Sequence, residues 1–173
     1  MKKSDIEWDI ESSVRIAMNY ASYRYAFFSK LNISLAIISL VSIWFSGFVF
    51  SGEHKTISAI LNIVGSVSLV FDVVLNIKGC NGFWKSMYEG YNGFFAEFAR
   101  IQPAASVEEL QSLKSKLVEF DGKCNADFNA LGLIAWNDAC IQMGKDKYVK
   151  KIPWYKRLTA NFFSWGSVAD NFK

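Results

Sequence analysis

The chain has 173 residues and a nearly balanced charge, with 19 Lys and Arg against 16 Asp and Glu. This weak net charge argues against a nucleic-acid-binding protein. The single histidine and the three cysteines show no spacing typical of a metal site or a thiol-based catalytic pair. We therefore expect a non-enzymatic protein with no cofactor, no bound metal and no nucleic-acid partner.

Residues 1–30 are expected to form a cytoplasmic amphipathic helix that leads into an apolar segment. Apolar side chains recur at helical spacing from Ile6 to Phe28. Arg24 and Lys30 lie near the end of this helix, where they either contact lipid phosphates or are ordinary solvated charges. The sequence leaves both interpretations open.

Two apolar segments follow, 31–50 and 57–77, and Asp72 is the only charged residue in either. Because a helix rises ~1.5 Å per residue, each segment is about long enough to cross a ~30 Å hydrocarbon core. The short link that contains Ser51–Lys55 allows only a tight hairpin. We predict a transmembrane helical hairpin over 31–77. A buried hairpin in a soluble bundle is the alternative, but uncharged runs of this length are rare in soluble chains of this size.

Basic residues gather on the side of the hairpin that carries the two termini. Those near the spans are Arg15, Arg24, Lys30, Lys78 and Lys85, whereas the connecting loop has Lys55 alone. The positive-inside rule therefore predicts both termini in the cytoplasm. The three cysteines, Cys80, Cys124 and Cys140, would then lie in a reducing compartment, where we expect structural or incidental thiols.

Each predicted span has one face of small and polar residues. The face of the first span comprises Asn32, Ser39, Ser42 and Ser46, and that of the second comprises Ser58, Asn62, Gly65, Ser66, Asp72 and Asn76. Either these faces pack the helices together, or several hairpins assemble and turn them towards water. Asp72 lies about 7.5 Å from the end of its span, so a Lys30–Asp72 ion pair would neutralise it without a pore.

After the hairpin, residues 78–173 are predicted to form a cytoplasmic helical region. Aromatic residues recur about every 3.5 positions over 84–101, and Pro103 ends this helix. Ser106 and Glu109 have the spacing of a capping box that starts the next helix. Its predicted buried stripe is Leu110, Leu113, Leu117, Phe120 and Cys124. A further helix is predicted from Phe128 to about Gly144.

The segment 145–157 holds six positive charges against one negative, and apolar side chains follow at helical spacing. This combination favours an amphipathic helix on anionic lipid, at ~1 kcal/mol per basic residue near the surface. A final helix that packs its aromatic residues on the bundle is the alternative. The residues assigned to the lipid interface are Lys147, Lys150, Lys151, Trp154, Lys156, Arg157, Phe162 and Trp165.

The layout resembles the SLATT proteins, two-transmembrane effectors of prokaryotic conflict and antiphage systems. The resemblance covers nearly the whole chain and rests on the basic residues before 31–50, the hairpin, the aromatic helix 84–101, the capped helix from Ser106 and the segment 136–139. It implies that a trigger drives oligomerisation and that the hairpins permeabilise the bacterial inner membrane. Because the tail has no room for a separate sensor domain, the trigger would come from a partner protein or bind the helical tail.

These expectations combine into one prediction. The chain is an all-α inner-membrane protein with two spans, an N-terminal helix and a C-terminal cytoplasmic helical bundle. It forms homo-oligomers in the lipid bilayer and acts as a pore-forming or membrane-disrupting effector of abortive infection. A membrane scaffold that recruits a partner through its cytoplasmic helices is the alternative, and a holin-like lysis protein is a third.

Overall fold

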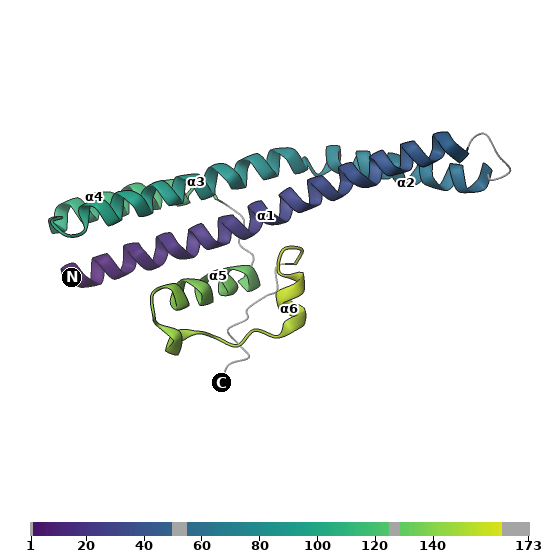
Figure 1. The fold of residues 1–173 in the computed structure, drawn as a ribbon. Helices are drawn as coiled ribbons and strands as arrows, with labels where there is room; N and C mark the ends of the chain where they lie inside the picture. The colour runs from purple at the N-terminus through teal and green to yellow at the C-terminus, as the bar shows by residue number, and fades with distance from the viewer. Residues whose placement is uncertain (1, 50–54, 125–128, 164–173) are drawn as a thin grey trace. The chain divides into compact units, whose positions relative to one another are not determined.

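The computed structural model describes residues 2–49, 55–124 and 129–163, and all regular structure in these ranges is helical, as predicted (Figure 1). In chain order the elements are α1 (Lys3–Val49), α2 (Lys55–Val74), α3 (Ile77–Ile101), α4 (Val107–Asp121), α5 (Asn129–Gln142), a 3-10 turn η1 (Asp146–Tyr148) and α6 (Trp154–Thr159). The chain divides into two compact units: Tyr25–Trp84, and Met1–Arg24 with Lys85–Lys173.

The unit Tyr25–Trp84 is a helical hairpin in which the second half of α1 and α2 run antiparallel (Figure 1). Lys3–Phe45 and Thr56–Val74 are each long and apolar enough to cross a membrane. Only 11% and 17% of their most apolar windows are buried. The core helix of a soluble protein would instead be mostly buried, so this exposure favours lipid as the surrounding medium.

The second apolar segment does not continue as one helix to Ile77. α2 ends at Val74, and a turn at Leu75 and Asn76 separates it from α3. Asn76 has a φ of 45°, in the left-handed region that asparagine adopts more readily than most residues. Of the last three residues of the predicted span, Leu75 and Asn76 therefore form the turn and Ile77 begins α3.

In the other unit, the first part of α1 packs with α3 and α4. The guanidinium of Arg15 lies 4.5 Å from the centroid of the Phe95 ring, and Lys114 of α4 forms an ion pair with Asp9 of α1. Tyr91 of α3 packs edge-on against Phe120 of α4, with 5.1 Å between the ring centroids. The larger apolar residues buried on these three helices include Ile6, Ile10, Val14, Met87, Tyr91, Phe98, Leu110, Leu113 and Leu117. The predicted α4 stripe is thus confirmed at its three leucines.

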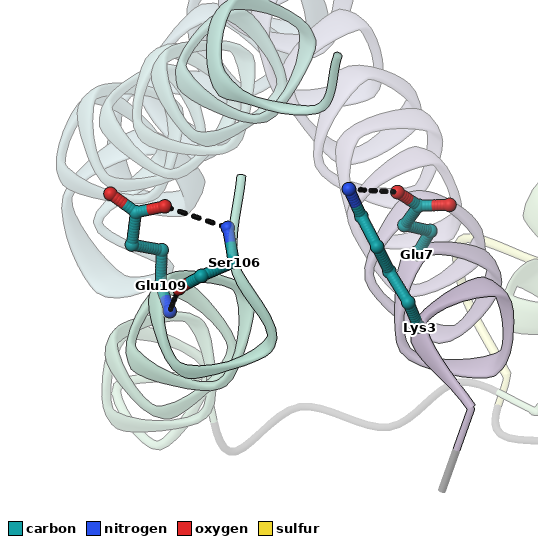
Figure 2. Close-up of polar contacts among 4 residues, drawn as sticks. All are labelled: Lys3, Glu7, Ser106 and Glu109. Carbon is teal, nitrogen blue, oxygen red and sulfur yellow. Dashed lines mark hydrogen bonds and ion pairs between the residues drawn. The ribbon is translucent and has the colours of Figure 1, made fainter. Parts of the chain in front are cut away.

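The start of α4 is the predicted capping box (Figure 2). The Ser106 hydroxyl accepts a hydrogen bond from the Glu109 backbone N–H at 3.2 Å, and the Glu109 carboxylate accepts one from the Ser106 N–H at 2.8 Å. These bonds satisfy two backbone donors that a helix start leaves without a partner. α3 ends at Ile101, two residues before Pro103, as the proline predicts.

α5 attaches to α1 through side-chain hydrogen bonds. The Asn19 amide donates to the Ala135 carbonyl at 3.4 Å, and the Tyr23 hydroxyl donates to the Asp138 carboxylate. Ala160, just after α6, joins the apolar cluster formed by Ala130, Leu131 and Ile134. α5 ends at Gln142, and Gly144 follows with a φ of 65°, a conformation that glycine adopts without strain.

Candidate functional site

Part of the predicted polar face is the contact between α1 and α2. Ser39 and Ser42 of α1 are buried, with 5% and 3% of their surface exposed, and so is Ser58 of α2. A Cβ atom on Gly65 would lie 2.9 Å from the Ser42 Cβ. Small side chains therefore let the two backbones approach closely, as is common for membrane helices.

The remaining predicted face of α2 does not lie in this contact. Asn62 and Ser66 are exposed, and Asn76 lies exposed in the turn after α2. The side chain of Ser46 is outside the described residues. The structure thus divides the predicted polar face of α2 into two parts. One part packs against α1, and the other is an exposed polar edge.

Ser68 belongs to the packing face although the sequence analysis did not select it. It is buried, and its hydroxyl donates to the Val64 carbonyl at 2.9 Å. Because Ser68 follows Gly65 by three positions, it lies on the same side of the helix. The three-residue spacing from Gly65 is the sequence feature that predicts Ser68 on the packing face.

A cavity of about 150 Å³ lies between the helices of the hairpin. It is lined by Asn32, Leu35, Ala36, Ser39, Ser68, Leu69, Asp72 and Lys78. Two of its polar atoms, Ser39 Oγ and Asp72 Oδ1, are buried without a hydrogen-bond partner among the described residues. Buried oxygens of this kind require water, a proton or a cation, and the cavity is large enough for water. The site can hold polar species inside an otherwise apolar hairpin.

The predicted Lys30–Asp72 ion pair does not form. Lys30 is exposed, and the ion pairs among the described residues do not include it. Lys78 is the cation that lines the cavity together with Asp72. The sequence pattern does not predict this role for Lys78, because its position in the cavity depends on the turn at Leu75 and Asn76.

The predicted lipid-interface residues lie around η1 and α6. Lys147, Lys150, Lys151, Arg157 and Phe162 are exposed, and Trp154 is 74% exposed. Lys156 is buried instead, because it projects from the opposite side of the short α6 to Trp154. Trp165 lies outside the described residues.

α6 covers only Trp154–Thr159, so the predicted repeat of apolar residues does not form one continuous helix over the described residues. Trp154, Leu158 and Phe162 are 74%, 69% and 61% exposed. Their exposure leaves an apolar surface beside a cluster of positive charges.

Within residues 2–49, 55–124 and 129–163, no three His, Cys, Asp or Glu side chains come together as a metal site. Comparison of the chain with protein-family models, with curated proteins and with solved structures gave no match.

Proposed function

We propose that this chain is a membrane-embedded hairpin that self-associates and permeabilises the bilayer that contains it. The observation that carries the proposal is the exposed polar pair Asn62 and Ser66 on α2. Their neighbours Ile63 and Val67 are exposed apolar residues suited to lipid. An amide in hydrocarbon is unfavourable unless it finds a hydrogen-bond partner, and a second hairpin or water supplies one.

Ser39 and Ser42 of α1 are not available for this assembly, because they are buried against α2. Contacts between copies would therefore use the edge of α2 that carries Asn62 and Ser66. One hairpin cannot enclose an aqueous path, so permeabilisation requires an oligomer. The cavity with Asp72 and Lys78 would then provide a hydrated polar site near one end of the path.

We place the hairpin in a bacterial inner membrane with both termini in the cytoplasm. The bias of basic residues towards the sides of the termini supports this orientation. The resemblance of the layout to SLATT proteins supports a role as an antiphage effector that awaits a trigger. In this role a separate sensor protein would control assembly.

A membrane scaffold is the second candidate, and one observation favours it. Ser39, Ser42, Ser58 and Ser68 are all buried, so much of the polar face already serves helix packing within one copy. A scaffold would need only this stable hairpin as an anchor, with the cytoplasmic helices recruiting a partner. It predicts no change of membrane potential on expression.

The test is a voltage-sensitive dye in bacteria that express the chain from an inducible promoter, with and without phage challenge. The Asn62→Leu/Ser66→Leu variant removes the exposed polar pair without entering the packed face. Ile63→Leu/Val67→Leu is the matched control, because it changes two exposed apolar residues of the same helix. All three proteins are compared at equal abundance in the membrane fraction.

Depolarisation by the wild type and the control, but not by the Asn62→Leu/Ser66→Leu variant, is the expected result. Depolarisation that persists in this variant would exclude the exposed edge of α2 as the assembly surface. If the wild type does not change the membrane potential either with or without phage, the scaffold is favoured.

A further inference from the structure

A second cavity, of about 520 Å³, is formed by residues of the C-terminal tail. Its walls come from α5, η1, the segment that leads into α6, and Arg157 of α6. Its lining includes the cations Lys150, Lys151 and Arg157 and the acidic groups Asp138 and Asp146. The cavity shares no residue with the hairpin site.

The segment that carries two of these cations is held in place by α5. The Asn137 side chain accepts a hydrogen bond from the Lys150 backbone N–H at 2.8 Å and donates one to the Lys150 carbonyl at 2.7 Å. The Trp136 indole donates to the Tyr148 carbonyl at 3.4 Å. Side chains of α5 thus satisfy backbone groups that have no partner in a helix or sheet, and so hold the segment that carries Lys150 and Lys151.

The charges that line the cavity favour an anion. Lys150, Lys151 and Arg157 form no ion pair with any residue in the described part of the chain. The Asp138 carboxylate already accepts a hydrogen bond from the Tyr23 hydroxyl. The lining therefore carries three positive and two negative charges, and one of the two carboxylates already accepts a hydrogen bond. The net charge of the cavity is positive, which suits a phosphate group.

An apolar surface adjoins these cations. Trp154 and Leu158 of α6 are 74% and 69% exposed, and Phe162 and Phe163 that follow are also exposed. A soluble phosphate compound is polar throughout and would leave this apolar surface exposed to water. An anionic phospholipid matches both parts, because its headgroup is charged and its acyl chains are apolar, and aromatic residues favour the boundary between them.

We propose that the tail binds anionic phospholipid, with the headgroup phosphate in the cavity at Lys150, Lys151 and Arg157. Trp154 and Leu158 enter the boundary between headgroups and acyl chains. The tail thus contacts the membrane surface independently of the hairpin. This inference stands on the tail alone and does not depend on conduction by the hairpin.

The bound tail would also be coupled to α1. The Arg24 guanidinium donates to the Asn161 carbonyl at 2.8 Å, and Tyr23 reaches Asp138 at the cavity. Both residues belong to α1, the helix that continues to Val49. Occupation of the cavity would therefore hold α5 and the residue Asn161, which follows α6, against the first part of α1.

The test is native mass spectrometry of the detergent-solubilised full chain, titrated with phosphatidylglycerol or with phosphatidylcholine of the same acyl chains. The site variant is Lys150→Gln/Lys151→Gln/Arg157→Gln. The matched control is Lys2→Gln/Lys116→Gln/Lys123→Gln, which removes the same charge from exposed positions outside the cavity. Circular dichroism checks that the three proteins have equal helix content.

We expect the site variant to bind phosphatidylglycerol at least about tenfold more weakly than the wild type, and the control to change by less than about twofold. Binding of phosphatidylcholine should be the same in all three. Equal phosphatidylglycerol affinity in wild type and site variant would overturn the proposal, and so would an equal loss in the control.

Two further measurements separate a lipid from a soluble phosphate compound. In nanodiscs with brominated phosphatidylglycerol, the fluorescence of Trp154, obtained as the difference from Trp154→Phe, should be quenched. Absence of that quenching would overturn insertion of α6. Displacement of phosphatidylglycerol by millimolar inorganic phosphate would overturn the lipid as occupant and assign the cavity to a free phosphate compound.

Discussion

Gly65 of α2 faces Ser42 of α1 so closely that a Cβ atom on Gly65 would lie 2.9 Å from the Ser42 Cβ. Real Cβ atoms do not approach one another to this distance, and the Ser42 Cβ moves only if the backbone of α1 moves with it. This pair therefore sets the spacing of the two helices where Gly65 meets Ser42. It also explains why Ser42, rather than a larger residue, lies in the middle of an apolar helix.

We predict that Gly65→Val destabilises the hairpin by about 1–3 kcal/mol, because overpacking forces the two helices apart. Ala59→Val is the matched control, since Ala59 is an exposed residue of the same helix. Denaturant-induced unfolding of the detergent-solubilised proteins measures the difference. Equal stability of the two variants would show that the close Gly65–Ser42 contact is not required.

Two glycines of α3, Gly90 and Gly93, test the packing of α3 on α4. A Cβ on Gly90 would overlap the Phe120 Cζ, whereas a Cβ on Gly93 would meet nothing within 4 Å. Gly93→Ala should stabilise the protein by about 0.5–1 kcal/mol through helix propensity. Gly90→Ala should lose that gain and destabilise by about 1–3 kcal/mol, because Phe120 must move. Thermal unfolding should therefore shift in opposite directions for the two variants.

Tyr91 makes the stability of the unit formed by Met1–Arg24 and Lys85–Lys173 depend on pH in the alkaline range. Burial, and then the hydrogen bond from its hydroxyl to Asp121, raise the pKa of Tyr91 far above its ordinary value of 10.0. Below pH 10 the phenol is protonated in both folded and unfolded chains, so its contribution to stability is fully present. Above pH 10 the unfolded chain loses this proton and the folded chain keeps it, so the free energy of unfolding falls.

Tyr91→Phe should remove this part of the alkaline decline and cost about 1.5–3 kcal/mol at neutral pH, because Asp121 loses its buried donor. Unfolding curves at several pH values from neutral to alkaline measure both effects. Parallel pH profiles of wild type and variant would contradict the prediction, whatever the difference at neutral pH.

The three cysteines should differ in reactivity. Cys140 is buried in α5, and burial raises the pKa of its thiol against a smaller lowering by Lys150. A higher thiol pKa leaves less of the reactive thiolate at neutral pH. N-ethylmaleimide should therefore modify Cys140 after Cys80 and Cys124, which are half-buried. Peptide mass mapping over time measures the order, and a denatured sample, in which the order should disappear, is the control.

Several features could be predicted from the sequence because they depend on neighbours along the chain. The capping box needs only Ser106 and Glu109 at the correct spacing, and Pro103 cannot continue a helix. The leucine stripe of α4 follows from helical periodicity alone. The apolar segments likewise indicate two long helices, because length and hydrophobicity are local properties.

Which residues of the predicted polar face are buried and which are exposed could not be predicted in the same way. Asn62 and Gly65 are both within the predicted face, yet Asn62 is exposed and Gly65 meets Ser42. Which edge of a face is buried depends on the rotation of two helices against one another, and periodicity defines only the face. The same applies to Lys78, which reaches the Asp72 cavity because the chain turns at Asn76.

The sequence by itself determined the helical class, the hairpin of two apolar helices and the caps that begin and end the tail helices, because short-range sterics and hydrophobic periodicity set these. Only the tertiary structure decided which polar side chains line a cavity. The tail cavity depends on Asn137 clamping the backbone of Lys150, a contact between segments that are separate along the chain. Such contacts arise from packing of whole elements, and no local pattern encodes them.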